Sequence, residues 1–160
     1  MTSSVVLLFL VQWLHVIAGL IWVAGHVVAG YLLPRAMLGK PTTAARAVYD
    51  PFSKALRPLL MAAGVVMVIA GILRGTVFGP VRSLASAFAT PYGLTWILAL
   101  ALTLTLMVHG GRWQQRLPEL IWNGEFRQPG AQAQVDRHGL MELTLFAGIL
   151  ACMVLMRFGI

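Results

Sequence analysis

The chain has 160 residues, of which 59% are hydrophobic and only 11% charged, and its mean hydropathy is +0.81. A soluble domain carries about 25% charged residues, so this composition excludes an ordinary water-soluble domain and indicates a chain whose solvent is lipid. The formal net charge of +7 would suggest nucleic acid in a soluble protein, but we assign it to membrane topology, because basic residues collect in cytoplasmic loops, and expect no nucleic-acid partner.

Four apolar runs follow one another, each about the 20 residues needed to cross a bilayer. We therefore expect an all-α integral membrane protein, a four-transmembrane-helix antiparallel bundle that forms a single membrane domain over residues 1–160. The first run lacks a basic segment before it and exceeds the length of a signal sequence, so we interpret it as a retained span. The expected spans cover about residues 5–33, 59–77, 92–111 and 138–157.

The first span carries two of the four histidines, His15 and His26. Their separation of eleven residues is three helical turns plus about 20°, so both imidazoles leave the same side of the helix, about 16 Å apart. The same face also presents Gly19, Trp22 and Gly30. A membrane helix with imidazoles and missing side chains on one face is suited to a flat, metal-containing ligand.

The first loop runs from Arg35 to Arg57. We expect it to be broken up by Pro41 and Pro51 within it and by Pro58 directly after it. The second loop is short, and its middle, VRSLASAFA, predicts a small interfacial helix, after which Pro91 suits the first turn of span three.

The third loop, from Arg112 to Arg137, is the longest polar stretch, and its QPGAQAQ segment predicts flexibility. Trp113 and Trp122 flank the end of span three and are typical of aromatic residues at a membrane interface.

Basic residues set the expected orientation. The first and third loops hold five and four Lys or Arg residues, whereas the second loop and both chain ends hold few. We therefore expect the first and third loops in the cytoplasm and both termini outside. This corresponds to a multi-pass protein of a bacterial inner membrane with periplasmic termini.

This topology brings three histidines to one depth on three different helices: His26, His109 and His138. His15 lies about three turns further out, near the middle of the bilayer. Polar ligand residues inside a span are costly and usually functional. The glycines and the separate helices favour haem over a structural zinc site, whose ligands would cluster locally.

We predict haem b, with His26 and His109 as the best axial pair and His138 as the rival partner for either. His15 could hold a second haem with Met61 or Met67, hold a five-coordinate haem, or bind copper. The candidate site is completed by Gly19 and Trp22 on the face of span one.

Glu142 stands one turn after His138 on the same helix face. An acid inside a span is a functional candidate, here a catalytic proton relay beside a redox centre or a quinone. The alternative is a hydrogen-bond partner that orients His138, as carboxylates do for ligating histidines.

The segment HVIAGLIWVAG, with His15, Trp22 and Gly25, resembles the first helix of CopD-type copper-resistance membrane proteins. Extended through YLLPR, it also resembles HemJ-type protoporphyrinogen oxidases, which are four-helix haem-b membrane enzymes. Span three, YGLTWILALALTLTLMVHGGR, is similar to both. The HemJ-type enzymes carry a functional lysine in span three, where this chain has none between Ile97 and Leu100.

From these patterns we expect a b-type haem protein that transfers electrons, between the quinone pool and a partner or as a subunit of a larger membrane redox complex. Other redox subunits or a second copy of the chain are the expected protein partners. The resemblances imply two alternatives: copper handling along His15, Met61 and His26, or oxidation of a porphyrinogen.

Overall fold

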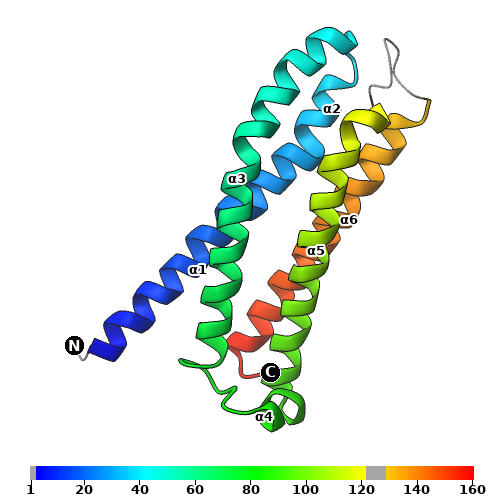
Figure 1. Ribbon diagram of the computed structural model, residues 1–160. Coiled ribbons are helices and arrows are strands. Elements are labelled where there is room, and N and C mark those ends of the chain that lie inside the picture. Colours follow the sequence, from blue (N-terminus) through cyan, green and yellow to red (C-terminus); the bar gives the residue numbers. More distant parts are fainter. Residues whose placement is uncertain (1–2, 122–128) are drawn as a thin grey trace.

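The computed structural model describes residues 3–121 and 129–160, and these are all-α (Figure 1). The first span is continuous but has three parts: α1 (Ser3–Val27), a π-helical segment η1 (Val28–Leu32) and α2 (Leu33–Met37). The elements that follow are α3 (Thr42–Gly75), α4 (Leu84–Ala89), α5 (Pro91–Ile121) and α6 (Ala131–Arg157).

Four helical stretches are long and apolar enough to cross a membrane. They are Ser3–Met37, Thr42–Gly75, Pro91–Glu119 and Ala131–Arg157. Many large apolar side chains cover the outside of the bundle, such as Leu20, which is 66% exposed. In water this surface would be unstable, whereas lipid solvates it. The chain is therefore a multi-pass membrane protein in contact with the bilayer.

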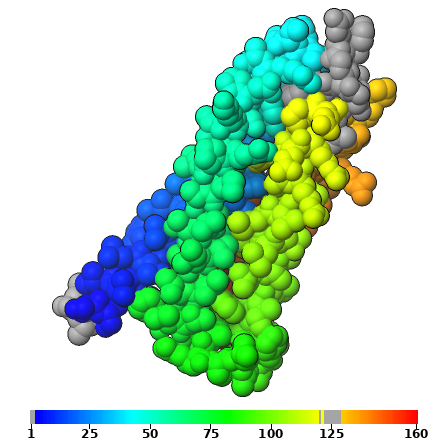
Figure 2. All heavy atoms as spheres, viewed as in Figure 1, coloured from blue at the N-terminus to red at the C-terminus, as the bar shows by residue number. Residues whose placement is uncertain are grey.

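The bundle consists of two helix pairs. Helix α1 packs along α3, and α5 packs along α6, whereas contacts between the pairs are fewer. Both chain ends and α4 lie at one end of the molecule, and α2 lies at the other (Figure 1). We call these the α4 end and the α2 end. The N-terminal part of α1 leans away from the bundle at the α4 end (Figure 2), so the two pairs meet most closely near η1.

The loop expected from Arg35 to Arg57 is mostly helical. Helix α3 begins at Thr42 and continues through Pro51 and Pro58. Each proline removes one backbone hydrogen bond, but Ala45 and Tyr49 of this extension are fully buried. They belong to an apolar cluster that holds the α2 end together and contains Leu38, Ala45, Tyr49, Leu117, Ile121, Ala131 and Val135. The stabilisation from this packing outweighs the loss of the backbone hydrogen bonds that the prolines cannot make.

The second loop matches its prediction. Helix α4 occupies the centre of the segment VRSLASAFA, and Pro91 opens α5. Ser83 caps α4, because its hydroxyl accepts a hydrogen bond from the backbone N–H of Ser86. In the third loop, α5 continues to Ile121 and α6 begins at Ala131, inside the QPGAQAQ segment. Trp122 and the start of that segment lie outside the described residues.

Helix α6 packs against the first span at Gly139, a position without a side chain. A Cβ at Gly139 would overlap the ring of Tyr31. Near this contact an exposed ion pair joins Arg35 to Asp136, and the Arg35 guanidinium lies 5.7 Å from the centre of the Tyr31 ring. The close approach of these helices brings the residues of α6 within reach of α1.

We predict that Gly139→Ala destabilises the bundle by about 1–3 kcal/mol, the usual effect of overpacking, because the rigid Tyr31 ring must move. The measurement is the melting temperature of the purified protein in detergent. Gly111→Ala is the matched control, because Gly111 is also within a helix but a Cβ added there would have nothing within 4 Å. Equal melting temperatures for the two variants would contradict the packing described here.

Candidate functional site

The site begins with an irregularity in the first span. Pro34 has no N–H and so cannot donate to the carbonyl of Gly30, four residues earlier, as an α-helical residue would. The indole N–H of Trp113 donates to that carbonyl instead, over 3.1 Å. Here the helix widens into the π-helical segment η1, a form that is often found at functional sites.

The missing side chain at Gly30 makes room for a carboxylate. A Cβ at Gly30 would lie 2.9 Å from Oε2 of Glu142 and 3.3 Å from Nε2 of His138. Glu142 is only 1% exposed and His138 4%. The sequence suggested that the space beside Gly30 could hold a ligand ring. The side chains of Glu142 and His138 fill this space instead.

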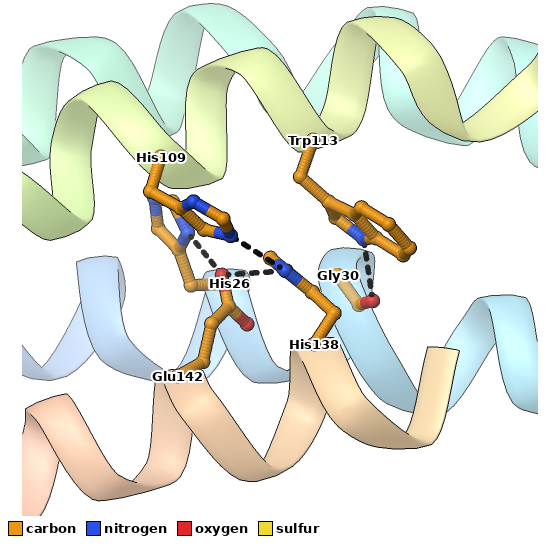
Figure 3. Close-up of polar contacts among 6 residues, drawn as sticks. All are labelled: His26, Gly30, His109, Trp113, His138 and Glu142. Carbon is orange, nitrogen blue, oxygen red and sulfur yellow. Dashed lines mark hydrogen bonds and ion pairs between the residues drawn. The ribbon is translucent and has the colours of Figure 1, made fainter. Parts of the chain in front are cut away.

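Glu142 lies between two imidazoles (Figure 3). Its Oε1 accepts a hydrogen bond from Nδ1 of His26, 3.3 Å away. The same oxygen is 3.1 Å from Nε2 of His138, one turn earlier on α6. This second contact has the distance of an ion pair but not the alignment of a hydrogen bond. One carboxylate thus links α1 to α6.

A third imidazole extends the arrangement to α5. Nε2 of His109 and Nδ1 of His138 are 3.1 Å apart, and one of them donates to the other. The two rings are stacked, with centroids 5.1 Å apart, and Trp113 stacks on His138 at 4.1 Å. Figure 3 shows these side chains converging from three helices. We call His26, His109, Trp113, His138 and Glu142 the polar cluster.

The polar cluster is closely packed. Gly110 follows His109 on α5, and a Cβ there would lie 2.5 Å from Cε1 of His26. Oε2 of Glu142 is buried and has no hydrogen-bond partner among the described residues. Within the same part of the chain, no three His, Cys, Asp or Glu side chains are arranged to hold a metal ion. In this arrangement the cluster is a chain of polar contacts, suited to holding or passing a proton.

Trp22 separates the polar cluster from the rest of the bundle interior. Its ring is 2% exposed and lies edge-on to His26, with centroids 4.7 Å apart. It also meets Phe146 of α6, with centroids 5.6 Å apart, and Phe146 lies 6.4 Å from His26. Beyond Trp22, toward the α4 end, α1 leans away from the bundle (Figure 1), whereas Trp96 of α5 still contacts α3.

A cavity of about 460 Å³ lies beyond Trp22 on this side of the bundle. All four long helices line it, mostly with apolar side chains. Its polar groups include His15, Arg74 and Thr103. Ligand pockets typically have volumes of about 300–1,000 Å³ and combine apolar walls with few polar groups. We call this space the His15 cavity.

The imidazole of His15 is fixed in its wall. Its Nδ1 donates a hydrogen bond to the backbone carbonyl of Met67, over 2.8 Å. The ring lies against Gly71, where a Cβ would come within 3.0 Å of Cε1. Gly19 faces Met67, whose sulfur lies 3.5 Å from the position of a Cβ. The Nδ1 bond leaves Nε2 as the nitrogen able to bind a ligand.

The structure thus separates the predicted site residues into two groups. It brings together His26, His109, His138 and Glu142, the convergence expected from their depths. His15 and Gly19 line the cavity, and Trp22 touches both regions. Their roles as haem, metal or catalytic residues stay predictions.

Trp113 was expected at the interface but belongs to the polar cluster; its place one turn after His109 was the available signal. Met61 and Met67 were both named as partners of His15, and the structure places Met67 against it through the backbone carbonyl. This choice depends on the register of α1 against α3, which no sequence pattern specifies.

Comparison with known proteins identifies no family, since no family description, curated protein or solved structure matches the chain.

We predict that Glu142→Gln lowers the free energy of unfolding by about 1–3 kcal/mol, because one imidazole then faces an amide N–H and a buried polar group loses its partner. Asp136→Asn is the control. It breaks the Arg35–Asp136 pair, whose side chains are 45% and 38% exposed, and exposed pairs contribute below about 1 kcal/mol. Thermal unfolding in detergent measures both, and a larger loss for Asp136→Asn would refute a structural role for Glu142.

Trp113→Phe keeps the stacking on His138 but removes the indole N–H. The carbonyl of Gly30 then loses this hydrogen bond inside the bundle, and we expect a loss of about 1–3 kcal/mol. Trp13→Phe is the matched control, because Trp13 is 51% exposed on the lipid-facing surface. The same melting experiment compares them, and an unchanged melting temperature for Trp113→Phe would show that this bond is dispensable.

Proposed function

We propose that the chain is a b-type haem protein of the membrane that transfers electrons, and that haem occupies the His15 cavity with His15 as an axial ligand. The observation that carries the proposal is the His15 imidazole, held through Nδ1 at the wall of a large apolar cavity.

The hydrogen bond of His15 supports this role. Histidines that ligate metals almost always donate their other ring N–H to a carbonyl or carboxylate, which fixes the tautomer and the ring orientation. The Nδ1 contact with the Met67 carbonyl has this form and leaves Nε2 as the donor to a metal.

The cavity supports a large flat ligand. Its volume of about 460 Å³ falls in the range of small-molecule sites. Trp96 and Phe146 are among its walls, and such side chains exclude water. His15 would hold the group through Nε2, whereas Met67 lies on the Nδ1 side of the ring, where its carbonyl is bound; we therefore propose a five-coordinate iron.

The close packing of the polar cluster also favours placing the haem at His15. His26, His109 and His138 already contact other polar groups, and the spaces at Gly30 and Gly110 are filled by Glu142 and His26. A macrocycle between His26 and His109 would have to displace these contacts. We therefore place the haem at His15 and propose that the polar cluster joins the helix pairs and holds a proton near the cavity.

Haem in this cavity would supply one-electron redox chemistry, whereas the chain's residues bind it, orient it and exclude water. A quinone or another redox subunit in the bilayer would exchange electrons with it. We further propose a bacterial inner membrane with the α2 end in the cytoplasm, because eight of the eleven Lys and Arg residues in the described chain belong to the first and third loops, whose described parts lie toward that end.

The alternatives from the resemblances have less support. Copper handling would use His15, Met61 and His26 along one path, but Met61 is outside the lining of the His15 cavity and His26 is bound to Glu142. A porphyrinogen oxidase of HemJ type would use a span-three lysine, which this sequence lacks.

The test is the visible spectrum of the purified protein, recorded as dithionite-reduced minus oxidised. We expect a haem b spectrum in the wild type and its loss in His15→Ala, with recovery when imidazole is added to His15→Gly.

His109→Ala is the control, because His109 is a histidine of the same bundle outside the cavity. It should keep the haem spectrum. Loss of the spectrum in folded His109→Ala with retention in His15→Ala would move the haem to the polar cluster. No haem spectrum from folded wild type would refute the proposed function.

A further inference from the structure

Arg74 places a positive charge at the α4 end of the His15 cavity. It lies near the end of α3 and is one of the residues that line the cavity. Its Nε donates a hydrogen bond to Oε1 of Gln12 on α1, over 2.8 Å. This bond ties the guanidinium to α1 and occupies one of its nitrogens, Nε.

No acid of the described chain pairs with Arg74. The ion pairs of the described residues are His26–Glu142, His138–Glu142 and Arg35–Asp136. None of them includes Arg74. The acids of the whole sequence are Asp50, Glu119, Glu125, Asp136 and Glu142. None of them belongs to the lining of the cavity. An arginine inside a membrane span usually has a partner or a function, and Gln12 supplies no negative charge.

The position of Arg74 relative to His15 defines what could bind. The His15 ring lies against Gly71, and Arg74 is three residues further along α3, about 4.5 Å along the helix axis. The arginine side chain adds its own length toward the α4 end. A flat ligand held at its centre by His15 would therefore meet the guanidinium at one edge.

We propose that the ligand of the His15 cavity carries a carboxylate at its edge, which Arg74 binds. Guanidinium groups bind carboxylates through paired, charge-assisted hydrogen bonds. The cavity would thus select an acidic tetrapyrrole, which bears carboxylates, over a neutral flat molecule such as a quinone. This inference rests on the proposed function. It adds the residue that binds the carboxylates and the orientation of the ligand, whose acidic edge faces the α4 end.

The test uses metal-free protoporphyrin IX and its dimethyl ester, which differ only in whether the carboxylates are free. The full chain is purified from a host unable to make haem and placed in nanodiscs of phosphatidylcholine. Trp22 and Trp96 line the cavity, so quenching of tryptophan fluorescence reports binding of either porphyrin.

We expect Arg74→Gln to weaken binding of the free acid by about tenfold to a hundredfold, the effect of losing hydrogen bonds to a charged group. Binding of the dimethyl ester should not change. Arg82→Gln is the control, because Arg82 lies at the same end, donates to the carbonyl of Val77 and is outside the cavity lining. It should alter neither affinity.

A second comparison needs no variant. The wild type should bind the free acid at least about tenfold more tightly than the ester, although the ester partitions better into lipid. Equal binding of the two porphyrins, or equal weakening of both by Arg74→Gln, would overturn the inference.

These results are separable from the proposed function. If His15→Ala keeps its haem but Arg74→Gln weakens binding of the free acid and not of the ester, axial ligation by His15 fails and the carboxylate site stands. If His15→Ala loses haem while Arg74→Gln binds acid and ester like the wild type, the carboxylate site fails and the proposed function stands.

Discussion

The structure depends on one buried carboxylate. Glu142 of α6 accepts a hydrogen bond from His26 of α1 and lies 3.1 Å from His138 of its own helix. In a bilayer, water cannot replace these contacts, and an unpaired buried charge costs several kcal/mol. The two helix pairs, α1 with α3 and α5 with α6, are therefore held together where Glu142 reaches across. His109 and Trp113 of α5 complete the contact, and the π-helical segment of the first span makes room for it through Gly30.

The close contact at the polar cluster contrasts with open space toward the α4 end. Trp22 and Phe146 lie near His26 and also line the His15 cavity. Polar side chains thus specify how the pairs meet, and the cavity beyond them is mostly apolar. The electron transfer that we propose at the cavity would lie close to the proton that we propose in the polar cluster, because the Trp22 ring in the cavity wall is 4.7 Å from His26.

Much of this could be predicted from the sequence. Hydropathy and helical spacing predicted the four spans, the short helix α4 and the convergence of His26, His109 and His138 with Glu142, because depth in a bilayer follows from position in a span. Helical periodicity could not specify the rotation of one helix against another. The pairing of His15 with Met67 and the stacking of Trp113 on His138 both depend on that rotation. The helical path of α3 through Pro51 and Pro58 depends on packing of Ala45 and Tyr49 against distant residues.

We propose that haem lies in the His15 cavity and not in the polar cluster. The most direct measurement is the position of the iron in crystals of the haem-loaded protein, from anomalous scattering at the iron edge. We expect a single peak at bonding distance from Nε2 of His15, with the Met67 carbonyl still bound to Nδ1. A peak between His26 and His109, with their contacts to Glu142 and His138 broken, would contradict it.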